Sequence, residues 1–224
     1  MTDTETVPET ARRIVVLGAS GRTGLPLVEQ ALDNGHTVVA FVRDAEKLPF
    51  SPADYDDRLV VVEGDAYTGE GVAEAIKGAD AVVSTLGQTD GSPDDLLTVA
   101  GDHVLAAMAD HDVDRFVTLV GAGVREEGEA VSMTGRVMGG LLKLLAREVL
   151  EDAAEHVRRV TQTDTRWTVA RAPRLVDGDG TGDYEAGDVS LGFEAIARAD
   201  VARFLLDCVE DDDYVGEMPK VGPA

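Results

Sequence analysis

Residues 13–24, which read RIVVLGASGRTG, decide the fold. The run Ile14-Val15-Val16 is compact and β-branched, and the strand that it predicts ends at Gly18. Three glycines follow at the spacing G-x-x-G-x-x-G, and apolar residues then recur with helical periodicity from Leu25 to Leu32, before the pair Asn34-Gly35. This order predicts a buried strand, a tight turn and a helix that ends at the Asn-Gly pair.

The spacing of the glycines predicts a phosphate-binding turn. Gly18 lets the chain turn sharply off the strand, Gly21 lets the backbone approach a pyrophosphate, and Gly24 lets the helix pack close to the sheet. The amides and the dipole of the helix N-terminus favour an anion there. A glycine triplet also occurs in ordinary strand-to-helix turns, but this one has the required context on both sides. We therefore predict a dinucleotide-binding loop that consists of Gly18, Ala19, Ser20, Gly21, Arg22, Thr23 and Gly24.

Outward from this stretch, apolar strands alternate with helical segments. The predicted strands are residues 36–42, 59–62, 80–84, 115–120 and 167–171, and the predicted helices are residues 71–76, 96–109, 136–160 and a closing helix around Val201, Phe204, Leu205 and Val209. Strands that are apolar throughout are typical of parallel strands covered on both faces. We therefore predict a single doubly wound Rossmann-type α/β domain over residues 13–224, with six to seven parallel strands and helices on both faces of the sheet.

Three segments fall outside this alternation. Residues 1–12 are expected to form a disordered acidic tail. The irregular segments 121–135 and 173–191 follow the carboxyl ends of predicted strands, and that edge is where open α/β sheets bind their ligands. These two segments are therefore the predicted substrate-side loops.

The end of the second strand bears on the choice between NAD and NADP. The sequence there is Phe41-Val42-Arg43-Asp44, so Arg43 stands where an acidic residue would bind a ribose 2′-hydroxyl and an arginine would accommodate a 2′-phosphate. Arg22 could reach the same phosphate as a second cation. The alternative is that Arg43 pairs with Asp44 or Glu46 on the surface. We expect NADP(H) to be favoured over NAD(H).

Two further strand ends are expected to complete the cofactor groove. Asp65 and Ala66 follow the third strand, where an adenine would lie and Asp65 could accept from its amino group. Thr85, Leu86 and Gly87 follow the fourth strand, beside the expected adenosine ribose and pyrophosphate. Each feature alone is common, but their joint placement supports the dinucleotide prediction.

The charge of the chain excludes several classes of partner. Lys and Arg number 20 against 43 Asp and Glu, which gives a net charge of −23, and no basic cluster stands out. A nucleic-acid backbone or an anionic membrane would be repelled, so we expect a small-molecule substrate and neither of those partners. Asp outnumbers Glu by 26 to 17 and Arg outnumbers Lys by 16 to 4. That bias is typical of proteins from cells with molar salt, and an ordinary acidic protein is the alternative.

The rest of the composition indicates a cytoplasmic protein. Cys208 is the single cysteine, so no intrachain disulfide can form. Residues 1–10 are polar and acidic, unlike a signal peptide. The most apolar helical stretch, residues 137–145, is too short to cross a bilayer. The histidines show no ligand spacing, so no metal site is expected.

Together these features resemble the atypical short-chain dehydrogenase/reductase superfamily, in particular its NAD(P)H-binding branch, which includes biliverdin/flavin reductases and NmrA-like proteins. The similarity extends over residues 13–216 and includes the segments 167–175 (WTVARAPRL), 180–184 (GTGDY) and 196–202 (IARADVA). The resemblance implies that the backbone at Pro173 lies near the nicotinamide and that residues 176–189 form part of the substrate side. A monomer or a small homo-oligomer is expected.

The sequence departs from the superfamily where catalysis is concerned. Catalytic members use a Tyr-x-x-x-Lys pair for proton transfer, and the matching positions here fall near Val149 and Ala153. The usual serine falls near Gly121 or Ala122. Reduction of a ketone by that proton relay is therefore disfavoured, whereas hydride transfer to a flavin or a quinone-like acceptor needs no dedicated acid. One alternative is a non-catalytic NADP(H)-binding sensor of the NmrA-like type. A sugar-nucleotide epimerase is a further alternative, which the short C-terminal part of the chain disfavours.

A few further side chains are candidates for the substrate side. His156 lies near the replaced pair and could donate a proton, or could be a surface residue among Glu155 and Arg158. Tyr184 could close over the cleft or anchor its loop. An anionic group of a substrate could be held by Arg125, Arg136 or Arg174.

Overall fold

The computed structural model describes residues 11–125, 147–192 and 194–224. Its strands are β1 (Arg13–Leu17), β2 (Thr37–Val42), β3 (Leu59–Glu63), β4 (Ala81–Ser84), β5 (Arg115–Gly121), β6 (Arg166–Ala172), β7 (Arg174–Val176), β8 (Tyr184–Gly187), β9 (Ala195–Ala197) and β10 (Lys220–Pro223). Its helices are α1 (Gly24–Asp33), α2 (Val72–Ile76), α3 (Leu96–Asp110), α5 (Arg147–Val160) and α6 (Arg198–Glu210), with short 3₁₀ helices η1 (Ala45–Lys47) and η2 (Pro52–Asp54). Among the described residues, no helix is long and apolar enough to span a membrane.

The strands confirm the doubly wound α/β prediction. Within the described residues, eight strands form one sheet in the order β3-β2-β1-β4-β5-β6-β10-β8. Seven of them run parallel, and β8 joins at the edge, antiparallel to β10. The chain order reverses between β1 and β4. Ligands of open α/β sheets bind at such a reversal, outside the carboxyl ends of the strands.

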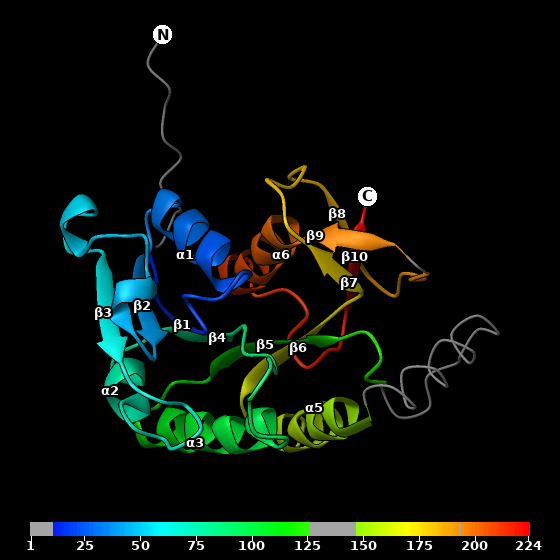
Figure 1. Cartoon of the computed structure of the whole chain (residues 1–224), viewed down its shortest axis with the longest axis horizontal. Helices are drawn as coiled ribbons and strands as arrows, with labels where there is room; N and C mark the ends of the chain where they lie inside the picture. The colour runs from blue at the N-terminus through cyan, green and yellow to red at the C-terminus, as the bar shows by residue number, and fades with distance from the viewer. Residues whose placement is uncertain (1–10, 126–146, 193) are drawn as a thin grey trace, which may run out of the picture.

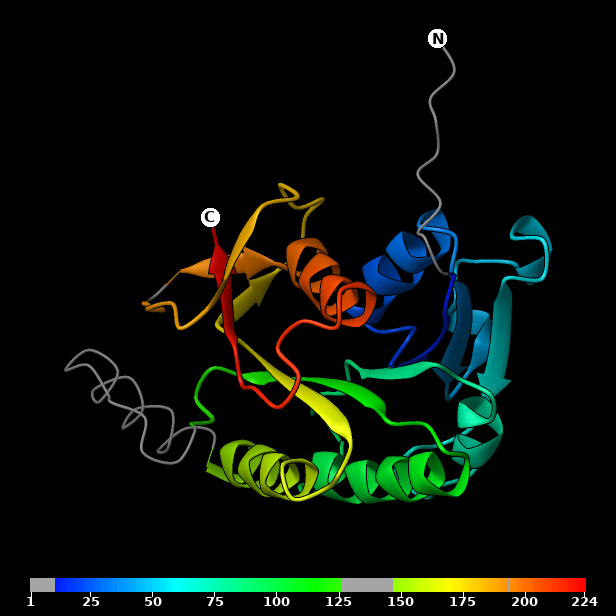
Figure 2. The same cartoon turned by 180° about the vertical axis from the view of Figure 1, so that it is seen from behind.

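Helices cover both faces of this sheet. Helices α1 and α6 pack on one face, and α2, α3 and α5 pack on the other (Figure 1, and from behind in Figure 2). Side chains alternate between the two layers: Ile14 and Val16 belong to the core under α1 and α6, whereas Val15 and Leu17 belong to the core under α3 and α5. All four are fully buried, which explains why β1 is apolar throughout.

The sequence pattern does not predict β7, β8, β9 or β10. Strands β7 and β9 form a separate parallel pair, and β10 lies between β6 and β8, so α6 is not the closing element. Each of these strands is three or four residues long, which leaves little periodicity to detect. Gly222 and Pro223 in β10 also belong to the residue types that strands disfavour.

The predicted acidic tail lies mostly outside the described residues, which begin at Ala11. Arg12 itself is held in place. Its guanidinium donates to Asp212 (Nη1–Oδ1 3.3 Å), and its backbone amide donates to Nδ1 of His36 (3.1 Å). The parts of the predicted loop 121–135 and of the predicted helix 136–160 that fall in residues 126–146 also lie outside the described chain.

A buried arginine fastens the edge of the sheet opposite the strand carboxyl ends. Arg115, at the start of β5, is 1% exposed. Its guanidinium donates to the carbonyl oxygens of Arg166 (2.6 Å), Cys208 (2.6 Å) and Asp213 (3.1 Å). Burial lowers the pKa of Arg115. These bonds join β5 to β6 and to the end of α6, because a guanidinium in the core must satisfy its donors with the carbonyls around it.

His156 lies in the core, so the alternative that placed it on the helix surface is wrong. It is 3% exposed, its Nε2 lies 3.1 Å from Oγ1 of Thr118, and its ring meets Phe116 edge to face. Gly101 of α3 makes room for it, since a Cβ at that position would overlap the imidazole. Burial lowers the pKa of His156 to about 4, although Asp152 acts in the opposite direction.

This buried imidazole makes folding stability depend on pH. Because the pKa of His156 falls from 6.5 to about 4 on folding, the unfolded chain takes up the proton first as the pH falls. Stability that is complete above pH 6.5 is therefore lost toward pH 4, by about 3 kcal/mol. We expect urea unfolding to show this loss in the wild-type protein and a smaller one in His156→Gln, whose amide can keep the bond to Thr118. Equal pH slopes for the two proteins in this window would contradict a buried neutral imidazole.

Candidate functional site

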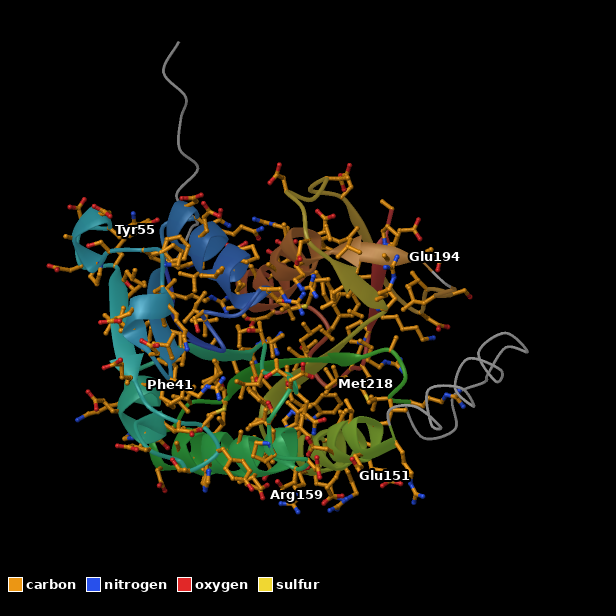
Figure 3. All side chains as sticks on the ribbon, in the orientation of Figure 1. Phe41, Tyr55, Glu151, Arg159, Glu194 and Met218 are labelled. Carbon is orange, nitrogen blue, oxygen red and sulfur yellow. The ribbon has the colours of Figure 1, made fainter. Side chains whose placement is uncertain are left out.

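A cavity of about 610 Å³ opens at the carboxyl edge of the sheet, and Phe41, labelled in Figure 3, is among the residues that line it. It is lined by the turns that follow β1, β2, β3 and β4, by the ends of β5 and β6, and by residues from α5 and α6. It therefore lies at the reversal of strand order between β1 and β4, where the topology predicts a ligand.

The cavity brings together most of the predicted cofactor residues. Its lining includes Gly18, Ser20, Gly21, Arg22, Thr23, Arg43, Asp65, Ala66, Thr85, Leu86, Gly87 and Pro173. The two exceptions, Ala19 and Gly24, are buried beside the lining residues of the loop. Residues that are far apart in the sequence meet here because parallel strands place their carboxyl ends at one edge.

The glycine loop has the geometry expected from its spacing. Gly18 adopts a positive φ of 77°, and its carbonyl accepts from the amide of Gly21 (2.8 Å). A Cβ at Gly24 would overlap that same carbonyl oxygen, so only glycine lets α1 begin this close to the turn. No side chain caps the N-terminus of α1. The hydroxyl of Thr85 donates to the carbonyl of Leu17 (2.9 Å) and thereby joins the turns after β1 and β4.

The alternative that Arg43 pairs with its acidic neighbours does not match the structure. Asp44 instead caps η1 by accepting from the amide of Glu46 (3.1 Å), and it pairs with Lys47 (3.4 Å). Arg43 is exposed on the cavity lining, and its guanidinium makes no hydrogen bond or ion pair with another described residue. Lys47, which the sequence analysis missed, also lines the cavity. Its position four residues after Arg43, across a single 3₁₀ turn, is the signal that could have identified it.

Two arginines at the other end of the glycine loop share one carboxylate. Arg22 lies 3.9 Å from Oδ2 of Asp177, and Arg198 lies 2.5 Å from Oδ1 of the same side chain. Both arginines line the cavity. The described lining thus holds four cationic side chains, from Arg22, Arg43, Lys47 and Arg198, against the single carboxylate of Asp65. Asp44 and Asp177, which lie outside this lining, pair with Lys47 and with the two arginines, so the local excess of positive charge is smaller than the lining alone suggests. In a chain with 43 acidic and 20 basic residues, it still favours an anionic ligand.

The wall formed by β5, β6, β7 and α5 is apolar. It includes Leu119, Val120, Val149, Ala153, Ala172 and Leu175. Val149 and Ala153, the positions expected for the Tyr-x-x-x-Lys pair, do face the cavity. No histidine or cysteine is among the described lining residues, so this wall offers no side chain that exchanges protons near neutral pH.

Polar groups at the rim are held by neighbouring carboxylates. The amide nitrogen of Gln88 donates to Asp152 (2.9 Å), which also accepts from the amides of Leu97 and Thr98 (2.9 Å each) at the start of α3. The hydroxyl of Tyr67 donates to Asp95 (3.1 Å), and this bond is the main reason why the pKa of Tyr67 is raised. Gln88 and Tyr67 both line the cavity, and the sequence analysis singled out neither.

The remaining candidates do not belong to the described lining. His156 contacts the core, and Tyr184 anchors its segment by donating to Asp207 (2.6 Å) and packing against Phe204. Arg125 and Arg174 are exposed elsewhere, and Arg136 lies outside the described residues. Among the described residues, no group of three or more His, Cys, Asp or Glu side chains is arranged to hold a metal ion.

Known proteins share this architecture over most of its length. The chain is 30% identical over 216 residues to the uncharacterized protein YwnB of Bacillus subtilis. The aligned region covers 92% of this chain and 95% of that protein. A short-chain dehydrogenase/reductase from Veillonella parvula, solved in complex with NADP, has a TM-score of 0.77 at 17% identity over 95% of each chain. The anaerobillin reductase ChuY from Escherichia coli O157:H7 has a TM-score of 0.73 at 20% identity, over 94% of this chain and 97% of that one.

The two structural likenesses concern the fold, and the family follows from the sequence itself. The model of a family described as NAD(P)H-binding matches residues 18–212, from the first glycine of the loop to beyond the end of α6. The parallel sheet and the glycine loop fit the atypical short-chain dehydrogenase/reductase superfamily, and the chain belongs to the family described as NAD(P)H-binding.

Proposed function

We propose that this protein is an NADPH-dependent oxidoreductase that reduces flat, conjugated acceptors such as flavins or quinones. The observation that carries the proposal is the cationic lining of the cavity in a strongly acidic chain. NADPH differs from NADH by a 2′-phosphate, so a surplus of cations beside the second strand favours the phosphorylated form.

Arg43 and Lys47 are the residues that would hold the 2′-phosphate. Asp44 is engaged by Lys47 and by the amide of Glu46, so the guanidinium of Arg43 keeps its donors for a ligand. Planar guanidinium groups match phosphate oxygens in bidentate fashion, and Lys47 adds a flexible point charge. The NADP complex of the Veillonella parvula protein supports this choice by analogy of fold.

The residues of the loop and the wall fit the rest of the dinucleotide. The uncapped N-terminus of α1 and the close approach of Gly18 to Gly24 leave backbone amides available to a pyrophosphate beside the side chains of the loop. When bound, the nicotinamide supplies the hydride. The apolar wall around Leu119 and Leu175 would pack against a flat ring and exclude water from it. Since Val149 and Ala153 offer no acid, the proton would come from solvent.

Replacing Arg43 tests the choice of cofactor. Arg43→Ala should weaken NADPH binding by about 10- to 100-fold, which corresponds to the loss of a charge-assisted bond pair. NADH binding should change little, because NADH has no 2′-phosphate. Isothermal titration calorimetry with both nucleotides measures this, and Arg158→Ala, at an exposed arginine of α5 outside the lining, is the matched control. An equal loss for NADPH and NADH would contradict the assignment.

A turnover assay separates an enzyme from a binding protein. NADPH oxidation is followed at 340 nm with flavins, quinones and small ketones. We expect turnover with the first two classes, faster than the reaction without protein, and a rate that changes little between pH 6 and 8, since no histidine or cysteine is among the described lining residues. Tight NADPH binding without turnover of any acceptor would instead favour the non-catalytic sensor.

A further inference from the structure

Asp177 stands between two arginines of the cavity. It follows β7 directly, and Arg198 follows β9, the strand that pairs with β7 in the register Val176 to Ala197. The carboxylate of Asp177 lies between the two arginines. Its Oδ1 is 2.5 Å from Nη1 of Arg198, and its Oδ2 is 3.9 Å from Nη1 of Arg22. Asp177 therefore links the start of α6 to the glycine loop.

The three side chains differ in how freely they can move. The side chains of Asp177 and Arg22 are 69% and 71% exposed, whereas that of Arg198 is only 12% exposed. An exposed carboxylate loses little when it gives up an ion pair, because water and salt replace the partner. A guanidinium that is mostly withdrawn from water is stabilised more by a neighbouring anion than an exposed guanidinium is. Arg198 is thus a fixed cation at the lining, and Asp177 is an exchangeable partner.

The segment that carries Asp177 has a second attachment. Asp200, two residues after Arg198, is buried and accepts from the amides of Thr181 and Gly182 (2.9 Å each). The segment between β7 and β8 would therefore stay fastened to α6 if the bond between Asp177 and Arg198 were exchanged. This separates the binding role of Arg198 from the attachment of the segment.

We propose that Arg198 binds the pyrophosphate of the dinucleotide together with Arg22, and that Asp177 competes with the pyrophosphate for both guanidinium groups. A carboxylate and a phosphate present the same pair of oxygens to a guanidinium, so one can replace the other without rebuilding the site. The proposal rests on the proposed function. It adds a cofactor residue on α6, outside the glycine loop and the second strand, and gives Asp177 an effect opposite to that of its partner.

Calorimetric titration of NADPH and NADH tests the proposal with four proteins: wild type, Arg198→Gln, Asp177→Asn and the control Arg158→Gln, at an exposed arginine of α5 outside the lining. Arg198→Gln should weaken both nucleotides by a similar factor, about tenfold, because both carry the pyrophosphate. Asp177→Asn should tighten both, by about threefold or more, because it removes the competing charge. Arg158→Gln should leave the affinity for both nucleotides unchanged, and far-UV circular dichroism with thermal unfolding verifies that each variant is folded.

The opposite signs distinguish competition from an ion pair that merely stabilises the fold. If Asp177→Asn weakens binding as Arg198→Gln does, or if neither affects binding, the proposal is overturned. An effect of Arg198→Gln on NADPH alone would assign Arg198 to the 2′-phosphate and would likewise overturn it. In the double variant with Arg198→Gln, Asp177→Asn should tighten binding less than it does alone, because only Arg22 remains as a cation for which Asp177 competes; an undiminished gain would overturn the role of Arg198. A wild-type protein that binds neither nucleotide would instead overturn the proposed function itself.

Discussion

The close contact between Gly24 and the carbonyl of Gly18 is the constraint on which the site depends. Because no Cβ fits between them, α1 begins directly behind β1 and directs its uncapped N-terminus toward the crevice. The hydroxyl of Thr85 bonds the carbonyl of Leu17 at the same point, so β4 is held in register with the turn. A larger residue at position 24 would displace the start of α1 from the glycine loop, most of whose residues line the cavity.

Beside the glycine loop, the protein brings together four cationic side chains from separate parts of the chain. Arg22 comes from the turn after β1, Arg43 and Lys47 from the end of β2 and the 3₁₀ helix behind it, and Arg198 from the start of α6. Of these elements, only β2 and η1 follow one another directly in the chain. The fold therefore assembles a cationic pocket that no basic cluster in the sequence reveals. It does so through the general property that parallel strands end at one edge.

Sequence patterns were sufficient wherever a residue's role is local. The bounds of β1, the glycine turn and the exposed position of Arg43 after β2 follow from runs and spacings within a few residues. Roles that arise from distant contacts were not accessible: Arg198 acquires its partner through the β7–β9 pairing, and His156 is buried because Gly101, on another helix, leaves space for its ring. Strand β10 was missed for the same reason. It forms through pairing with β6 and β8, although its glycine and proline are residue types that strands disfavour.

The contrast between an acidic surface and a cationic cavity also governs how fast a ligand arrives. A polyanion that approaches a molecule of net charge −23 meets repulsion long before it meets Arg43 or Arg198. The Debye length shrinks from about 10 Å at 0.1 M salt to about 3 Å at 1 M, so salt removes the distant repulsion while contacts inside the cavity keep more of their strength. Capture of the nucleotide should then accelerate with ionic strength, the reverse of the behaviour of an electrostatically steered encounter.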